Sequence, residues 1–406
     1  MATPPKPPAK TFSGPTRYVP DARAHFAALR AAAEDYPEAV EQSEGLGWMR
    51  RKPYDPSPGH PGYFNAMYAA LNTIQAMHLP PHALVVEVGA GPGWLTQILV
   101  GLGYRVIAVE PSATMNRLAQ ERVAGFSAMT GVATEGARFL TATLEEADLS
   151  PYLGEVDAVL FHEALHHMID ETTSMERIFG LLRPGGCIAV CGEGRWNPGD
   201  RALEAGLDAE MKRFGTLESP FTQPYLRHVL EAAGFTDVVF HHSVNGLFPE
   251  SGGDRPIAAV ANAPASSMNT VLGWRPLPSH LQGIPRLTSD PAQTSAGVEL
   301  LSSDWQGEEL VARVRLRNTG QTYWPRHAPA MAGGVTLALV EEPSPGAPHR
   351  EAGNRHPLAR DLLPGEEIVV EWRFDARGLD HAACRLRLVA EQAFWFPGGL
   401  RVPHPQ

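Results

Sequence analysis

The sequence of 406 residues predicts an α/β domain with a doubly wound, mostly parallel seven-stranded sheet, followed by an all-β domain that forms an antiparallel sandwich. Three observations support this prediction. Strand and helix patterns alternate over the larger part of the chain. A glycine-rich turn directly follows the first strand of that series. Beyond residue 276 prolines cluster, and the patterns that follow are those of short strands.

The first 60 residues are expected to form a flexible arm with a helical extension. Residues 1–20 are rich in proline and lack an apolar core, so we expect them to be disordered. Residues 22–42 have helical spacing of apolar side chains, with a break at Pro37. Several prolines in 48–61 predict a loop.

Alternating patterns then predict the α/β domain over 61–276. Apolar residues at helical spacing indicate a helix over 63–79 that leads into the first strand. The expected strands are 84–88, 105–110, 137–140, 156–161, 187–191, 236–243 and 268–274. The expected helices are 112–123, 170–182 and 223–233. Ser112 suits the N-cap of the first of these helices, and Gly234 the end of the last.

A linker over 277–294 and a second domain over 295–406 follow. Prolines mark the linker, and apolar and polar residues alternate in 310–317 as in a half-buried strand. The other expected strands are 335–339, 368–374 and 384–390. Turn signals at 318–320 and 363–365 separate strands, which favours an antiparallel β-sandwich.

Composition narrows the function classes. Acidic residues outnumber basic ones 45 to 34, and the formal charge of −11 disfavours a nucleic-acid partner. Three cysteines without a Cys-x-x-Cys motif argue against a zinc or disulfide framework and fit a reducing compartment. No apolar stretch is long enough for a membrane helix. We therefore expect a cytoplasmic protein, and an oligomer is compatible with the sequence.

The most informative segment is 85–94. An apolar strand is followed by Gly89, Gly91 and Gly93 at alternate positions and then by a helical pattern. Such a turn lets the backbone approach a ligand and directs helix N–H groups toward it. The next strand ends at Glu110, 21 residues after Gly89, where a carboxylate is placed to bind the two hydroxyls of a ribose.

The spacing of this turn argues against NAD or FAD. A dinucleotide turn has the form Gly-x-Gly-x-x-Gly/Ala, in which the last small residue permits close packing of helix and strand. Here the third glycine comes one residue early, and Trp94 occupies the small position.

The form Glu-x-Gly-x-Gly-x-Gly resembles motif I of the class I S-adenosylmethionine (SAM)-dependent methyltransferases. The likeness covers about 61–274 and includes, in the expected order, 87–93, 109–111, 165–167 and 182–186. It implies SAM as the cofactor, with the glycines at its methionine portion and Glu110 at its ribose. The implied cofactor contacts are Glu87, Gly89, Ala90, Gly91, Gly93, Glu110, Pro111, Thr143, Leu144, Phe161 and His162. The family's acid after strand three is displaced or replaced by Thr143.

Histidines and acids follow the fourth strand and are candidates for proton transfer. A hydroxyl group, such as that of a sugar, is a poor nucleophile at neutral pH, so its methylation needs a base that takes its proton. Histidine titrates near neutrality and is therefore the natural candidate for this base. The first candidate is His166, with Glu163 or Asp170 as its orienting partner, and the second is His167. Glu193 and Arg195 are tentative substrate contacts. A packing or capping role for the histidines stays open; His162, His166 and Asp170 have spacing that a metal could use, but no further ligand is evident and we expect none.

Finer likenesses suggest the acceptor. Segments 161–167, 192–193 and 208–218 are similar to methyltransferase domains of bacterial surface-polysaccharide biosynthesis proteins. Segments of the second domain (318–325, 363–366 and 388–396) resemble β-sandwich modules of glycan-handling enzymes and polysaccharide exporters. The resemblance implies a sugar or glycan hydroxyl as acceptor in polysaccharide biosynthesis, and a sandwich that binds carbohydrate or a partner.

Two alternatives stay open. The acceptor could be a small natural product or lipid, with an apolar wall made by Phe214, Phe221, Leu247 and Phe248. The chain could also be a glycan- or partner-binding protein with a degenerate methyltransferase domain, because the acid after strand three is unusual.

Overall fold

The computed structural model describes most of the chain, in two compact units. The described residues are 11–18, 46–54, 62–80, 82–214, 217–242, 248–249, 268–284, 287, 290, 293–326, 333–342, 349–358 and 360–404. The first unit consists of Met1–Leu79 and Leu84–Pro276, and the second of Pro80–Ala83 and Leu277–Gln406. The helix predicted over 22–42 lies outside the described residues. None of the described helices has the length and apolar character needed to span a membrane.

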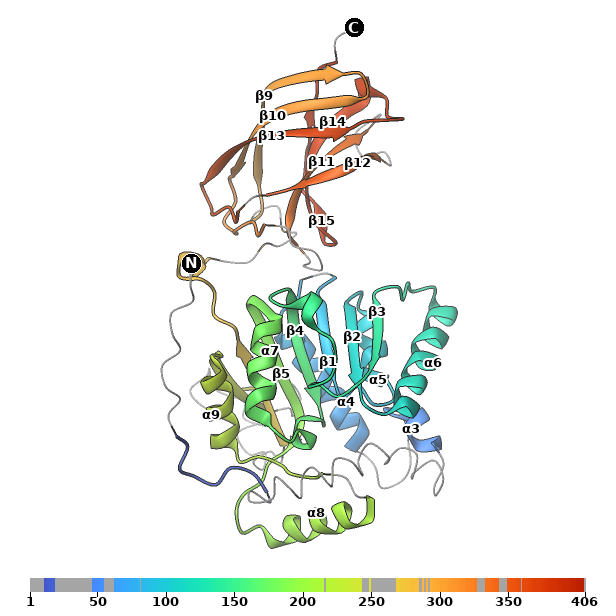
Figure 1. The fold of residues 1–406 in the computed structure, drawn as a ribbon, viewed down its shortest axis with the longest axis vertical. Coiled ribbons are helices and arrows are strands. Elements are labelled where there is room, and N and C mark those ends of the chain that lie inside the picture. The colour runs from blue at the N-terminus through green and yellow to red at the C-terminus, as the bar shows by residue number, and fades with distance from the viewer. Residues whose placement is uncertain are drawn as a thin grey trace. The chain divides into compact units, whose positions relative to one another are not determined.

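The first unit is built on one sheet with strand order β3-β2-β1-β4-β5-β8-β6-β7 (Figure 1). The strands are β1 (Leu84–Val88), β2 (Arg105–Glu110), β3 (Ala137–Thr141), β4 (Val156–His162), β5 (Leu182–Gly194), β6 (Thr236–His242), β7 (Phe248–Pro249) and β8 (Met268–Trp274). Strands β1 to β5 pair with one another in parallel, and β8 is antiparallel to both β5 and β6. The predicted seven-stranded, mostly parallel sheet is confirmed, and the two-residue β7 is an addition at its edge.

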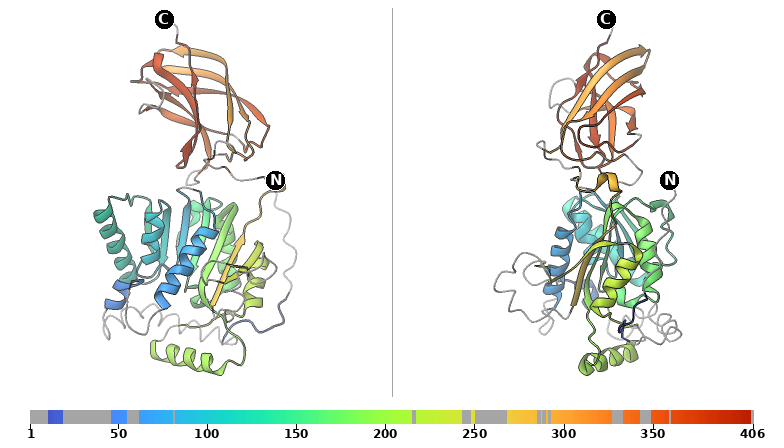
Figure 2. Two further views of the ribbon diagram at one scale, coloured as in Figure 1. Left: turned by 180° about the vertical axis from the view of Figure 1, so that it is seen from behind. Right: turned by 90° about the vertical axis from the view of Figure 1, so that its left-hand side faces the viewer.

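Helices cover both faces of this sheet. They are α3 (Gly47–Arg51), α4 (Gly62–Ala76), α5 (Trp94–Gly101), α6 (Ala113–Thr130), α7 (Glu171–Leu181), α8 (Arg201–Phe214) and α9 (Gln223–Ala233). Helices α7 and α9 lie on one face and α4 on the other (Figures 1 and 2). Apolar side chains of α4 and α5 pack with those of β1, β4 and β5 into a buried core that includes Ile74, Leu99 and Leu160. Because both faces are covered, β1 is buried along its whole length.

The boundaries follow local signals, with three differences from the prediction. Ser112 caps α6 as expected, its hydroxyl accepting from the amide of Met115, but the helix continues to Thr130 and ends at Gly131 in the left-handed conformation. Strand β5 begins at Leu182, five residues before the predicted start, because Leu182 pairs with Val156 of β4 and the backbone of 185–186 forms hydrogen bonds with Arg275. Residues 11–18, which we expected to be disordered, pair with the backbone of 220–222.

The second unit contains two antiparallel sheets, of order β13-β10-β9 and β12-β11-β14-β15, with β16 paired to β14. The strands are β9 (Ala296–Gln306), β10 (Glu309–Asn318), β11 (Val335–Glu341), β12 (Arg350–Pro357), β13 (Glu367–Asp375), β14 (Cys384–Ala390), β15 (Phe394–Trp395) and β16 (Leu400–Arg401). Both sheets contribute to one apolar core, with Leu310 and Val314 from one and Leu337 and Leu386 from the other. The predicted all-β, antiparallel character of this region is confirmed.

Candidate functional site

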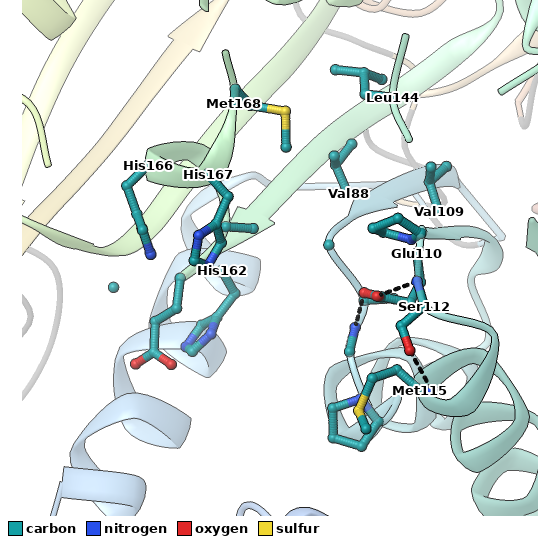
Figure 3. Close-up of a pocket in the computed structure, with 18 of the residues that line it drawn as sticks. Val88, Val109, Glu110, Ser112, Met115, Leu144, His162, His166, His167 and Met168 are labelled. Atoms are coloured by element: carbon teal, nitrogen blue, oxygen red, sulfur yellow. Dashed lines mark hydrogen bonds between the residues drawn. The ribbon is translucent and has the colours of Figure 1, made fainter. Parts of the chain in front are cut away.

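A cavity of about 530 Å³ lies beyond the carboxyl ends of β1, β2 and β4 in the first unit (Figure 3). The glycine turn, the segment after β2 and the segment after β3 line one part of it. The residues that follow β4 line another part, together with α3. This is the edge at which doubly wound sheets bind their ligands.

The glycine turn combines tight packing with open space. A Cβ atom on Gly89 would lie 2.5 Å from Cβ of Ala164, and one on Gly93 would lie 2.5 Å from Cβ of Ala119. At Gly91 nothing lies within 4 Å of the place a Cβ would take. All three glycines have positive φ, which other residues rarely adopt. Gly89 and Gly93 therefore let elements approach each other, and Gly91 keeps space open in the cavity.

The carboxylate of Glu110 forms a hydrogen bond with this turn. Its Oε2 accepts from the amide of Gly91 at 2.9 Å, and its Oε1 accepts from the amide of Ser112 at 2.9 Å (Figure 3). The residue is 8% exposed and lines the cavity. Two backbone N–H groups thus fix the carboxylate, and each carboxylate oxygen can accept more than one hydrogen bond.

The segment after β3 lines the cavity without a carboxylate. Thr143 and Leu144 are lining residues, as expected, and Glu145 is not. The hydroxyl of Thr143 donates to Glu146 at 3.0 Å. This segment therefore gives the cavity wall one hydroxyl-bearing and one apolar side chain.

Three of the expected cofactor contacts do not line the cavity: Glu87, Gly93 and Phe161. Glu87 is buried, and its carboxyl group accepts from the hydroxyl of Thr96 at 2.6 Å. Burial raises the pKa of Glu87 to about 8. The carboxyl group of Glu87 therefore helps to hold α5 against β1. Phe161 is fully buried in β4.

Four predicted polar residues at the end of β4 and just beyond it line the cavity: His162, Glu163, His166 and His167. His166 and His167 lie in a short 3-10 helix, Leu165–His167, and Figure 3 shows the histidines across the cavity from Glu110. Glu163 has a φ of +51°, uncommon for a residue with a side chain. Its carboxylate lies 3.5 Å from Nζ of Lys52. Burial opposes ionisation, yet His162 and Lys52 hold the pKa of Glu163 below its usual value.

His166, our first candidate for the base, is held as a cation. Its Nδ1 lies 2.7 Å from Oε2 of Glu193, and its Nε2 lies 3.2 Å from Oε2 of Glu218. Burial opposes protonation, but the two carboxylates raise the pKa of His166 well above its usual value. Both ring nitrogens therefore act as donors. The prediction that His166 is the base is wrong for this arrangement, because no lone pair is left to take a proton.

His167 has the opposite state. Its Nδ1 lies 2.6 Å from the carbonyl oxygen of Leu217, which can only accept, so the proton sits on Nδ1. Burial, and then the charge of His166, lower the pKa of His167 below its usual value. His167 is therefore neutral at physiological pH, and its Nε2 carries the lone pair.

The two tentative substrate contacts are corrected. Neither Glu193 nor Arg195 lines the cavity, although Gly192 and Gly194 do. Glu193 is fully buried, and its Oε1 accepts from the amides of Ala164 at 2.8 Å and Leu165 at 2.7 Å. Despite burial, the cation of His166 and these amides lower the pKa of Glu193 to about 2. Glu193 holds the segment after β4 in place.

Three residues that line the cavity on the side of the histidines were not singled out as site residues from the sequence. Lys52 comes from a stretch expected to be a loop, and Glu210 and Glu218 flank the end of α8. All three line the cavity. Glu218 belongs to the segment 208–218 that carried the finer resemblance, and this was the one signal for it.

His166, His167 and Glu218 form a cluster that could hold an ion. One potential ligand atom from each lies within 4.8 Å of the others. This set differs from the His162, His166 and Asp170 set considered from the sequence, in which Asp170 instead caps α7 through the amide of Thr173. Hydrogen bonds already engage both nitrogens of His166 and Nδ1 of His167. We therefore treat the cluster as a hydrogen-bonded network.

Comparison with known proteins gives a consistent result. Residues 86–190 match the family model of a methyltransferase domain. An uncharacterized methyltransferase of Anoxybacillus flavithermus is 30% identical over 162 residues, which are 38% of this chain and 69% of the relative. An uncharacterized methyltransferase of Mycobacterium tuberculosis is 38% identical over 106 residues, or 26% of this chain and 48% of the relative. The chain thus spans about half the length of this latter group of relatives.

Among solved structures, a Burkholderia thailandensis 1,6-didemethyltoxoflavin-N1-methyltransferase with bound S-adenosylhomocysteine is similar at 19% identity. The match covers 66% of this chain and 92% of that protein, with a TM-score of 0.38.

Proposed function

The chain belongs to the class I SAM-dependent methyltransferases, and from this premise we propose that it transfers the methyl group of SAM to a hydroxyl oxygen with His167 as the proton acceptor. The observation that carries the proposal is the hydrogen bond from Nδ1 of His167 to the carbonyl of Leu217. It leaves Nε2 as the basic atom of a residue that lines the cavity.

The residues of the cavity fit SAM. Gly91 keeps space open beside the glycine turn, and the carboxylate of Glu110 is held at the tip of β2, suited to two ribose hydroxyls. Among the described residues, Nε2 of His162 is buried without a hydrogen-bond partner, and His162 lines the cavity. An orphaned buried nitrogen in a cavity wall is an expected partner for a polar group of a ligand. When bound, SAM supplies a methyl group on a positively charged sulfur.

We call the part of the cavity lined by Lys52, Glu163, His167, Glu210 and Glu218 the acceptor side. These residues would position the acceptor hydroxyl and remove its proton. Nε2 of His167 would accept the proton of the acceptor hydroxyl as that oxygen takes up the methyl group that SAM would supply. The cation of His166, fixed by Glu193, discourages protonation of His167 before the reaction.

We propose a sugar or glycan hydroxyl as the acceptor, in surface-polysaccharide biosynthesis. The finer sequence resemblance supports this, and so does the polar character of the acceptor side. Glu163, Glu210 and Glu218 line the cavity there with His167, and Lys52 pairs with Glu163. Carboxylates and an imidazole suit a neutral polyol through hydrogen bonds, and they repel an anionic acceptor.

The apolar wall expected for a lipid or natural-product acceptor has less support. Phe221 is fully buried and does not line the cavity. Leu247 and the side chains of Phe214 and Phe248 lie outside the described residues. The third alternative, a binding protein with a degenerate domain, has to account for an intact glycine turn and a fixed Glu110 carboxylate.

The experiment incubates the full-length protein with SAM labelled in its methyl group and three acceptor classes: oligosaccharides from bacterial envelopes, phenolic natural products, and lipid vesicles. We expect label in the oligosaccharides as an alkali-stable methyl ether. Label only in phenols or lipids would overturn the glycan acceptor and leave the methyltransferase. No binding of millimolar SAM in calorimetry would overturn the enzyme itself and favour the binding protein.

We further propose that 61–276 is the catalytic domain and 295–406 a module that binds carbohydrate or a partner. The support is that the second unit has its own apolar core and resembles glycan-handling modules. Trp324 and Phe396 are buried in that core, so neither offers a surface for stacking on a sugar. Calorimetry of the full-length protein with envelope oligosaccharides, in the presence of saturating S-adenosylhomocysteine and an inhibitory acceptor analogue, would detect a second binding site.

A further inference from the structure

The N-terminal segment 11–18 lies against the acceptor side of the first unit. The backbone of Thr16 accepts from the amide of Thr222 at 2.9 Å, and the amide of Tyr18 donates to Pro220 at 3.0 Å. The hydroxyl of Tyr18 donates to Asp208 of α8 at 2.7 Å. This segment therefore connects the residues that precede α9 with the helix that carries Glu210.

The side chain of Arg17 in this segment is buried in the first unit. It is 3% exposed, and its guanidinium lies 4.5 Å from the centre of the Phe221 ring. Its Nε donates to the hydroxyl of Ser219 at 2.7 Å, and one terminal nitrogen donates to Glu171 at 2.9 Å. Glu171 is itself buried and accepts from the hydroxyl of Tyr225. A buried charge is thus paired and hydrogen-bonded, which such a charge requires.

The same guanidinium holds the backbone on both sides of His167. Its Nη2 donates to the carbonyl of His166 at 2.9 Å, and its Nη1 donates to the carbonyl of Met168 at 2.8 Å. These two carbonyls flank the residue that carries the proposed base. One planar, rigid group therefore sets the course of the backbone around His167, 150 residues away in the sequence.

We propose that Arg17 is a positioning residue that fixes the backbone of the His166–Met168 loop, and through it the direction of Nε2 of His167. Arg17 touches neither the cavity nor the reacting atoms. It acts by holding four hydrogen-bond partners at fixed angles, which a lysine cannot do, because an ammonium is a compact charge without a planar fork. This inference rests on the proposed function, in which His167 is the base.

The test compares Arg17→Lys and Arg17→Ala with the unchanged protein and with Arg117→Lys. Arg117 is an exposed arginine of α6 that pairs with Glu121, and it serves as the matched control. Misplacement of a catalytic group by about 1 Å can cost roughly 10²-fold in rate. We therefore expect kcat of both Arg17 variants to fall by about 10–10²-fold, with SAM affinity within about twofold, and guanidinium ion to restore part of the activity of Arg17→Ala. The control variant should keep its activity.

A second readout does not depend on turnover. Nitrogen-15 spectra of the histidine rings report the tautomer of each imidazole. In the unchanged protein we expect His167 to carry its proton on Nδ1, and in Arg17→Lys we expect a mixture of tautomers. If the protein has no methyltransferase activity but the tautomer responds in this way, the proposed function fails and the positioning role stands.

Two outcomes would overturn the positioning role. The first is an unchanged kcat in Arg17→Lys together with an unchanged His167 tautomer. The second is a loss of activity that is fully explained by the fraction of unfolded protein, while His167 in the folded molecules keeps its proton on Nδ1. Should both Arg17 variants fail to fold, Ser219→Ala removes one contact of the guanidinium without removing its charge, and the same two readouts apply.

Discussion

The two sides of the cavity are assembled from different parts of the chain. On the cofactor side, the amide of Gly91 and the carboxylate of Glu110 are 19 residues apart, within one strand–helix–strand unit. On the acceptor side, His167 meets Leu217 across 50 residues, and Arg17 reaches His166 across 149. A local unit can be encoded by a motif. A site made by distant segments depends on how the whole unit folds, and its details are free to differ between relatives.

The sharpest test of this difference is His167→Gln, which removes the proposed base and leaves the cofactor side intact. General-base catalysis contributes about 10²–10⁴-fold, so kcat should fall by that factor. SAM affinity, measured by calorimetry, should stay within about twofold.

The control is His78→Asn, an exposed histidine with positive φ, a conformation that asparagine tolerates. It should keep full activity. If His167→Gln kept at least half of the original kcat, the proton would have another acceptor and the assignment would be wrong.

The complementary change, Glu110→Gln, addresses the cofactor side. A hydrogen bond to a charged group contributes about 1.5–3 kcal/mol, so SAM affinity should fall by about 10–10²-fold. At saturating SAM, kcat should change little, because the acceptor side is untouched. Glu121→Gln, an exposed glutamate of α6, is the matched control. A fall in kcat without a fall in affinity would mean that the two sides are coupled.

Sequence reasoning predicted the sheet of the first unit well because its signals are local. Apolar strands, the glycine turn and the Ser112 cap lie within a few residues of the features they determine. It missed β9 and β12 in the second unit. Strand β9 is only partly buried and pairs with β10 through a β-bulge near Arg313, so its alternation of apolar and polar residues is irregular. Pairing with β10 and β11, respectively, makes these two segments into strands.

For the site, most of the residues predicted to contact the cofactor line the cavity, as do the clustered histidines, but the sequence could not choose between the histidines. Neighbours that are distant in sequence make the choice. The buried Glu193 turns His166 into a cation, and the carbonyl of Leu217 fixes the tautomer of His167. No spacing rule contains this information. The expected contact of Glu87 failed for a related reason, because an acid in a strand covered on both faces points into the core.

The pH dependence of kcat/KM should report the acceptor side. The base must be neutral, so the rate should fall about tenfold per pH unit below the pKa of His167, which lies below its usual value. In Glu193→Gln, His166 loses its closest carboxylate and more of it is neutral. The charge of His166 then depresses the pKa of His167 less. This outweighs the loss of the Glu193 charge, which makes a smaller contribution that raises that pKa, so the acid limb should move upward. A limb that moves downward, or stays in place while His166 is shown to be neutral, would contradict this electrostatic coupling.

The smallest expected effect concerns metal ions at His166, His167 and Glu218. In the structure these groups satisfy one another and the carbonyl of Leu217 by hydrogen bonds, so activity should not require an ion. Overnight treatment with a strong chelator should leave kcat within about twofold. Activity lost on chelation and restored by one divalent metal would replace proton removal by His167 with activation of the hydroxyl on a metal. The acceptor side would then still depend on distant segments, since Glu218 is 51 residues from His167, but as ligands rather than as hydrogen-bond partners.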